Sequence, residues 1–106
     1  MKLSVIIPCY NEKSTIKDII LAVTNAPYEN KEIIVIDDCS TDGTQNILKK
    51  DISELVQNII YHEKNLGKGA AIRSGIQKAT GDILIIQDAD LEYDPNEYPL
   101  MITPIL

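Results

Sequence analysis

The feature that most constrains the fold of this chain is a set of four short apolar blocks separated by segments of helical pattern. The blocks, which are rich in isoleucine, occupy residues 3–7, 32–36, 58–61 and 83–86. Continuous apolar runs of this length are typical of strands buried on both faces of a parallel sheet. The segments between them carry apolar residues at helical spacing, for example Ile16, Ile19, Ile20 and Val23. The sequence therefore predicts an α/β fold in which strands and helices alternate.

Proline, glycine and asparagine set the expected boundaries of these elements. Pro8 is expected to close the first strand, and the first helix, capped by Asn11, should end before Pro27. Gly81 should stop the helix before the fourth strand, and a final helix should begin near Pro95. Crossovers between parallel strands are right-handed. The expected strand order is 3-2-1-4, which is half of a doubly wound sheet.

Length and charge limit the classes of protein to consider. With 106 residues, of which 44% are hydrophobic, the chain is expected to form one globular domain over residues 1–106. The formal net charge of −6 argues against binding to nucleic acid. Two cysteines, Cys9 and Cys39, lack the spacing of a metal or redox motif, which favours free thiols, a reducing compartment and a cytoplasmic location.

The sequence ends on an apolar stretch, residues 101–106. Natural chain ends are usually polar, so we expect a truncated part of a longer protein. An exposed apolar end also favours self-association or marginal stability.

Acidic side chains gather where a doubly wound sheet binds its ligands, beyond the carboxyl ends of the strands. Asp88, Asp90 and Glu92 follow the fourth strand, next to the expected reversal of winding. Three carboxylates at this spacing repel one another unless a cation lies between them, and oxygen ligands suit Mg²⁺ or Mn²⁺. A nucleoside diphosphate is then the natural ligand, with the metal as Lewis acid for its phosphates. The alternative is a solvated turn without a metal.

A nucleoside pocket is predicted beside these carboxylates, at the ends of the first two strands. Tyr10 offers a stacking face and Asp38 an acceptor for a ring N–H of the base. Glu12 could accept hydrogen bonds from ribose hydroxyls or cap the first helix, and Asp37 could simply support its loop. Packing of Tyr10 on the loop is the plainer alternative for that residue.

Two further features are interpreted as structural. The Gly67-Lys68-Gly69 run lacks the upstream glycine and the hydroxyl residue of a phosphate-binding loop, so its glycines are expected to permit tight helix–sheet packing. His62 stands alone at the end of the third strand and is expected to be structural or exposed.

Four ordered segments, residues 4–12, 36–44, 65–69 and 88–90, together resemble family 2 glycosyltransferases of the GT-A fold. The resemblance covers essentially the whole chain, and residues 88–95 look most like the branch that makes polyprenyl- or dolichyl-phosphate sugars. It implies a three-layer, Rossmann-like, nucleotide-binding half of an enzyme that moves a sugar from a UDP- or GDP-linked donor to a lipid phosphate. The full-length enzyme would then work at the cytoplasmic face of a membrane.

The resemblance also implies residue roles. Positions matching Pro8, Tyr10 and Glu12 line the nucleoside site, Asp38 contacts the base, and Ile36 gives a backbone contact beside it. Ribose and phosphate contacts fall to Asp88 and Ala89, and the divalent metal to Asp90. The implied nucleotide-binding residues are Pro8, Tyr10, Glu12, Ile36, Asp38, Asp88, Ala89 and Asp90. The resemblance implies metal ligands at Asp90 and Glu92, and with Asp88 of the carboxylate cluster the predicted metal site is Asp88, Asp90 and Glu92.

This sequence departs from the family pattern at two positions and ends before part of it. Cys39 stands where glycine is common, and Cys9 where threonine or valine is common. The acceptor site and the catalytic base of the family lie beyond the position of Leu106, so no catalytic residue is assigned. Two other functions fit a small α/β domain with acidic loops: a phosphoacceptor signalling domain of the receiver type, and a nucleotide-binding module without turnover.

Overall fold

A computed structural model describes residues 2–28 and 30–87 of the chain. Its elements, in chain order, are β1 (Leu3–Cys9), α1 (Ile16–Thr24), β2 (Lys31–Asp37), α2 (Thr44–Ile47), the π-helical turn η1 (Leu48–Ile52), β3 (Asn58–Tyr61), α3 (Lys68–Lys78) and β4 (Ile83–Ile86). The predicted alternation of strands and helices is therefore confirmed across these residues.

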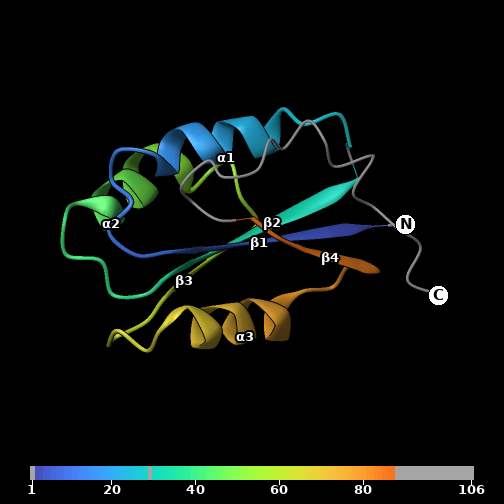
Figure 1. Ribbon diagram of the computed structural model, residues 1–106. Helices are drawn as coiled ribbons and strands as arrows, with labels where there is room; N and C mark the ends of the chain where they lie inside the picture. The colour runs from blue at the N-terminus through green and yellow to red at the C-terminus, as the bar shows by residue number, and fades with distance from the viewer. Residues whose placement is uncertain (1, 29, 88–106) are drawn as a thin grey trace.

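The four strands form one parallel sheet in the order β3-β2-β1-β4, as expected from the sequence. Figure 1 shows three layers, with α1 and α2 on one face of the sheet and α3 on the other. Right-handed crossovers give this arrangement, because the chain winds from β1 toward β3 and then crosses back to place β4 on the other side of β1. The reversal of winding lies between β1 and β4, the point at which doubly wound sheets bind ligands.

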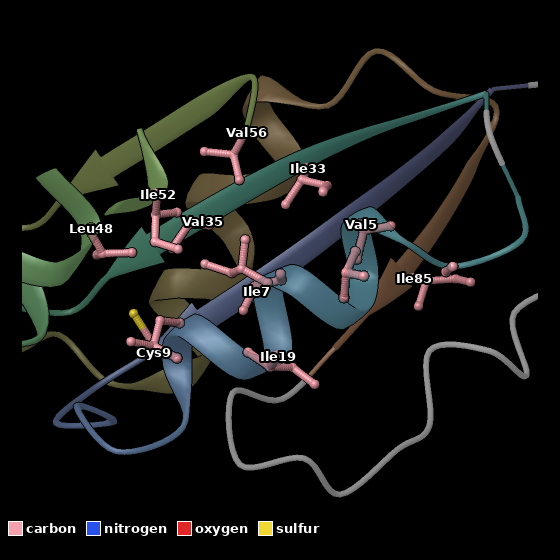
Figure 2. Close-up of a cluster of buried hydrophobic side chains, with 14 of the residues drawn as sticks. Val5, Ile7, Cys9, Ile19, Ile33, Val35, Leu48, Ile52, Val56 and Ile85 are labelled. Atoms are coloured by element: carbon pink, nitrogen blue, oxygen red, sulfur yellow. The ribbon is translucent and has the colours of Figure 1, made fainter. Parts of the chain in front are cut away.

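Alternate side chains of the central strands pack on opposite faces, which explains why the apolar blocks do not alternate with polar residues. Odd-numbered residues of β1 and β2 meet α1 and η1 in the larger core, shown in Figure 2. Even-numbered residues such as Ile6, Ile34 and Ile36 form a smaller core with Ala71 of α3. Both faces of β1 are buried, so this strand organises the sheet.

The expectation that Pro8 closes β1 is wrong, since the strand continues to Cys9. Pro8 pairs in register with Ile36 of β2 and has no N–H to donate. The Ile6 carbonyl faces β4, where it accepts a hydrogen bond from the Gln87 N–H. Residue 8 lies two positions after residue 6, so its backbone faces the same side. The N–H that Pro8 lacks would therefore point toward β4, whose described pairing with β1 runs to Ile6–Ile86. The β1–β2 ladder therefore loses no hydrogen bond at this proline.

The first helix also begins later than expected. Asn11 does not cap it: α1 starts at Ile16 with Thr15 as the N-cap residue, which makes no side-chain capping hydrogen bond. The helix ends at Thr24, before Pro27 as predicted. The expected helix from Pro95 lies outside the described residues. No helix among the described residues is long and apolar enough to cross a bilayer.

Tight packing of a helix on the sheet occurs at a glycine other than the two expected. A Cβ at Gly69 would meet only the Arg73 guanidinium, at 3.5 Å, and Gly67 has open space around its Cα. In contrast, a Cβ at Gly75 would lie 2.6 Å from Ile6 Cγ2 and 2.7 Å from Ile36 Cδ1. Gly75 therefore sets the distance between α3 and the sheet, and the interpretation of Gly67 and Gly69 as packing residues is wrong.

Candidate functional site

The loops that follow β1 and β2 are joined to each other at the carboxyl edge of the sheet. The Asp38 N–H donates to the Cys9 carbonyl at 2.9 Å, which extends the pairing beyond the end of β2. Asn11 has a φ of 53°, a left-handed conformation that asparagine tolerates better than most residues. Its N–H donates to Ser40 Oγ (2.9 Å), and its Oδ1 accepts from the Thr41 N–H (2.8 Å). Asn11 thus holds the two loops together.

Asp37 and Asp38 point to opposite faces of the sheet. Asp37 is fully buried on the α1 side, where its Oδ2 accepts from the Ser40 N–H (3.1 Å) and from Gln45 Nε2 (2.7 Å). Burial and the adjacent Asp37 carboxylate raise the pKa of the Cys9 thiol, which lies 3.8 Å from Asp37 Oδ1 and stays protonated. Asp37 therefore supports its loop, one of the two roles that the sequence left open.

Asp38 lies on the α3 side and accepts three hydrogen bonds. Its Oδ1 accepts from the Leu66 N–H (2.8 Å) and from His62 Nδ1 (2.9 Å), and its Oδ2 accepts from the Gly67 N–H (2.8 Å). Burial alone would raise the pKa of Asp38, but these three donors outweigh it and lower the pKa below its ordinary value. Asp38 is therefore an ionised acceptor at neutral pH, with the loop before α3 wrapped around it.

Gly67 is the glycine that this arrangement requires. Its φ of 96° places it in the left-handed region, which other residues rarely adopt. In that conformation it is the N-cap residue of α3, its N–H reaches Asp38, and its carbonyl accepts from the Ala71 N–H. The motif that carried part of the family resemblance thus holds Asp38 in place.

The other predicted nucleoside residues occupy varied positions along this edge. Tyr10 is 45% exposed, whereas Pro8 and Ile36 are buried in their strands. Glu12 is half-buried in the loop between β1 and α1, and its carboxylate accepts from Thr15 Oγ1 at 3.1 Å. Tyr10 and Asp38 follow the register pair Cys9–Asp37, so the structure brings their backbones together as the sequence predicted.

The predicted phosphate and metal residues, Asp88, Ala89, Asp90 and Glu92, lie outside the described residues, which end at Gln87 in this segment. Across the described ranges, no group of three or more histidine, cysteine, aspartate or glutamate side chains is placed to hold a metal. The donor set of Asp88, Asp90 and Glu92 consists of carboxylate oxygens, which fits a hard cation such as Mg²⁺ or Mn²⁺.

The partnership of His62 and Ser74 with Asp38 was not predicted from the sequence. His62 Nδ1 contacts Asp38 Oδ1, and His62 Nε2 contacts Ser74 Oγ at 2.8 Å. The signal that would have revealed it is the strand register, because Asp37 pairs with Tyr61 and the next residues along both strands are Asp38 and His62. The sequence predicted that His62 would be structural or exposed. It is structural, with its side chain 9% exposed.

Cys39 lies between these loops with a backbone conformation that explains a departure from the family pattern. Its φ of 63° is left-handed, and its Sγ lies 3.5 Å from the Glu63 carbonyl oxygen. A glycine, common at this position in the family that the sequence resembles, would adopt this φ without strain. Both Cys9 and Cys39 are free thiols, as expected.

The fold defines a class: a parallel α/β domain with acidic residues at the carboxyl edge of the sheet, beside a reversal of winding. The sequence model of glycosyl transferase family 2 matches residues 4–106 of this chain. The chain therefore belongs to glycosyl transferase family 2, and the sequence resemblance is confirmed.

Curated relatives support the branch that the sequence resembles. The chain is 36% identical over 106 residues to a dolichol-phosphate mannosyltransferase of Pyrococcus furiosus, covering 99% of this chain and 30% of the relative. It is equally identical to an undecaprenyl-phosphate 4-deoxy-4-formamido-L-arabinose transferase of Salmonella choleraesuis, covering 95% of this chain and 32% of the relative. The chain thus spans about a third of the length of these enzymes.

Solved glycosyltransferase structures share the fold. A mannosyltransferase from Pyrobaculum calidifontis, in complex with GDP-Man and Mn²⁺, matches 91% of this chain and 29% of its own, with a TM-score of 0.79 and 27% identity. S. aureus TarS in complex with UDP-GlcNAc matches 85% of this chain and 27% of its own, with a TM-score of 0.71 and 33% identity. The expected GT-A architecture is confirmed by these neighbours.

Proposed function

We propose that this chain forms the part of a glycosyltransferase that binds the nucleoside diphosphate sugar, and that the whole enzyme transfers the sugar to a polyprenyl phosphate. The names of two relatives, which refer to dolichol phosphate and undecaprenyl phosphate, support that acceptor. Cytoplasmic residence, with the reaction at the cytoplasmic face of a membrane, belongs to the same proposal. Self-association through residues 101–106 has no support from the comparisons and is not part of it.

The observation that carries the donor proposal is the state of Asp38. A carboxylate offers about four acceptor positions, and three are used by Leu66, Gly67 and His62. Since the pKa of Asp38 is low, the group can only accept, and its remaining position suits a ring N–H. Uracil and guanine carry such a donor, whereas the corresponding ring nitrogens of cytosine and adenine are acceptors. This matches the UDP and GDP ligands of structural neighbours.

Tyr10 and Glu12 complete the proposed nucleoside site. The exposed ring of Tyr10 is available to stack on the base, beside the acceptor on the adjacent strand end. Glu12 lies two residues further, with a half-buried carboxylate that can accept from ribose hydroxyls while keeping its contact with Thr15. This placement supports selection of the base by Tyr10 and Asp38, and of ribose by Glu12.

A divalent metal belongs to the proposal through Asp88, Asp90 and Glu92, which follow β4 in the sequence. When bound there, Mg²⁺ or Mn²⁺ would neutralise charge on the diphosphate leaving group. The residues of this chain bind and orient the donor at the end of the sheet. The catalytic base and the acceptor site are assigned to no residue of these 106.

The test is a calorimetric titration of the chain with UDP and with GDP, each in Mn²⁺ and in EDTA. We expect binding of at least one nucleotide in Mn²⁺, weakened roughly tenfold or more by EDTA or by Asp90→Asn, because the carboxylate–metal–phosphate contact is lost. Asp51→Asn, an exposed carboxylate in η1 paired with Lys17, is the control and should bind as the parent does. Equal affinity with and without the metal would remove it from the proposal, and absence of binding by either nucleotide would refute the donor site.

A further inference from the structure

Three side chains from three different segments form one hydrogen-bonded chain beneath the proposed nucleoside site. Asp38 follows β2, His62 follows β3, and Ser74 lies in α3. The His62 ring bridges the other two, with Nδ1 2.9 Å from Asp38 Oδ1 and Nε2 2.8 Å from Ser74 Oγ. The side chains of His62 and Asp38 are 9% and 5% exposed, so water competes little for these contacts.

The hydrogen bonds among Asp38, His62 and Ser74 have a definite arrangement of protons. Asp38 is an ionised acceptor, so the hydrogen between it and His62 belongs to Nδ1. With that hydrogen on Nδ1, Nε2 is the ring nitrogen that can accept from the Ser74 hydroxyl. Asp38 therefore fixes the tautomer of His62, and His62 in turn restricts the rotation of the Asp38 carboxylate.

An aspartate–histidine–serine chain also occurs where serine acts as a nucleophile, but the surroundings of Ser74 do not suit that chemistry. Ser74 lies beyond the first turn of α3, where backbone N–H groups donate within the helix. The N–H groups of Leu66 and Gly67, in the loop before the helix, are already bonded to Asp38. Neither of these two described segments therefore offers a tetrahedral oxyanion the donors that acyl transfer requires. The geometry instead suits an orienting role.

We propose that His62 and Ser74 are positioning residues for nucleoside recognition: their hydrogen-bonded chain holds the Asp38 carboxylate in the orientation that accepts from the base. This proposal rests on the proposed donor-binding function. Without His62, Asp38 would keep the Leu66 and Gly67 N–H donors but could rotate toward the space left by the ring. The residues act through Asp38, so their loss should weaken nucleotide binding without removing a ligand contact of their own.

The protonation state of Asp38 supplies a measurement that a merely structural role would not change. His62 is the titratable side chain among the three groups that lower the pKa of Asp38, and burial opposes them. Removal of the Nδ1–H donor should therefore raise the pKa of Asp38. Because a protonated Asp38 accepts poorly, the loss of nucleotide affinity on acidification should begin at a higher pH.

Two substitutions of His62 separate the two ring nitrogens. In His62→Asn the side-chain amide can take the place of Nδ1 and still donate to Asp38. In His62→Gln it reaches toward the position of Nε2 and the donor to Asp38 is lost. We expect His62→Gln to weaken UDP or GDP binding in Mn²⁺ by roughly tenfold, the usual effect of removing a hydrogen bond to a charged group, and to shift the acid limb upward. His62→Asn should retain the parental affinity and pH profile.

Ser74→Ala and Lys64→Ala complete the series. Ser74→Ala leaves the His62–Asp38 contact in place and should weaken binding about threefold, through a less restrained ring. Lys64 is exposed in the loop between β3 and α3, and Lys64→Ala should leave nucleotide affinity and its pH profile unchanged. Since the chain contains a single histidine, long-range ¹H–¹⁵N NMR of the parent reports its tautomer without overlap, and we expect Nδ1–H.

Each outcome decides between the proposals. Weak binding by His62→Gln with parental binding by His62→Asn supports positioning through Nδ1. Parental binding by both variants, equal losses in both, or an Nε2–H tautomer in the parent would overturn the positioning role while leaving the donor site intact. Failure of the parent to bind UDP or GDP would overturn the donor site and this inference with it. If His62→Gln does not fold, the Ser74→Ala affinity and the parental tautomer still decide.

Discussion

Left-handed backbone conformations at two loop residues show how individual positions shape the edge of the sheet. Asn11 and Cys39 both have positive φ, at 53° and 63°. Asparagine tolerates this region, and here its side chain and N–H bond the neighbouring loop. Cysteine has no such compensation beyond a long contact from Sγ to the Glu63 carbonyl. Position 39 is therefore a site of local backbone strain.

Cys39→Gly is expected to raise the free energy of unfolding. Relief of the left-handed strain contributes about 1–2 kcal/mol, and the greater freedom of glycine in the unfolded chain offsets about 0.4–1 kcal/mol of it. The net gain should be below about 1.5 kcal/mol, measured by urea unfolding. Cys39→Ala removes the same thiol but keeps the strain, so it should give no gain. A glycine variant no more stable than the alanine variant would contradict this account.

At the scale of elements, the close approach of α3 to the sheet depends on one glycine. Gly75 lies against Ile6 of β1 and Ile36 of β2, whereas Gly69, on the same helix, has room for a methyl group. This contact also positions Ser74, the neighbouring residue on α3, toward His62. Gly75 thus sets the distance between α3 and the sheet, and the adjacent Ser74 contacts His62 at the proposed site.

Substitution of these two glycines by alanine should have opposite effects. Gly75→Ala forces α3 away from the sheet and should destabilise the protein by about 1–3 kcal/mol, the usual effect of overpacking. Gly69→Ala adds a better helix former without a clash and should be neutral or stabilising, by up to about 1 kcal/mol. Chemical unfolding of both variants beside the parent provides the measurement. Equal effects would mean that helix propensity, and not packing, governs α3.

The elements themselves were predictable from the sequence, whereas their contacts depended on register. Apolar blocks and helical spacing predicted the strands and helices, because these signals are local, and the doubly wound pattern predicted the strand order. The continuation of β1 through Pro8 was not predictable, since it depends on the side of β1 to which residue 8 turns its backbone N–H position, toward β4 and away from β2. The His62–Asp38 contact was also not predicted, because it depends on the register that pairs Asp37 with Tyr61. Alternation along the strand already places Asp37 and Asp38 on opposite faces, but the partners that each carboxylate meets depend on that register.

Across the whole molecule, a buried acid at the amino end of the sheet lies opposite the proposed site. Glu32 of β2 is 4% exposed, and its Oε2 accepts from Ser4 Oγ (2.6 Å) and from the Thr80 N–H (2.6 Å) and hydroxyl (3.0 Å). Its Oε1 lies 3.6 Å from Lys2 Nζ. Burial alone would raise the pKa of Glu32, but these partners outweigh the effect of burial and lower the pKa below its ordinary value. The carboxylate therefore connects β1, β2 and the turn before β4.

The direction of this pKa shift gives stability a defined pH dependence. A carboxyl group whose pKa is lower in the folded state stabilises the fold at pH above its ordinary value, 4.5 for Glu32, and that stability is lost as the pH falls toward the folded pKa. Urea unfolding should therefore show the parent weakening below about pH 4.5, with Asp38 and Asp42 acting in the same direction.

Glu32→Gln tests the source of this dependence. The variant should be about 1–3 kcal/mol less stable at pH 7, because its donors lose a charged acceptor, and less dependent on pH in the acid range. Glu54→Gln, at an exposed position, should follow the parent at every pH. If the free energies of unfolding of Glu32→Gln and the parent fall in parallel as the pH decreases, a group other than Glu32 causes the pH dependence.

The central position of β1 has a consequence for the order in which the protein can be assembled during synthesis. Leu3 pairs with Ile83, so about 80 further residues must be synthesised after β1 before its second neighbour in the sheet exists. Until then β1 and β2 can pair, but one edge of β1 remains open to other chains. Pairing over so long a separation is slow in folding, and exposed strand edges invite aggregation. A nascent chain of this topology is therefore a natural client for a chaperone that shields strand edges until β4 has emerged.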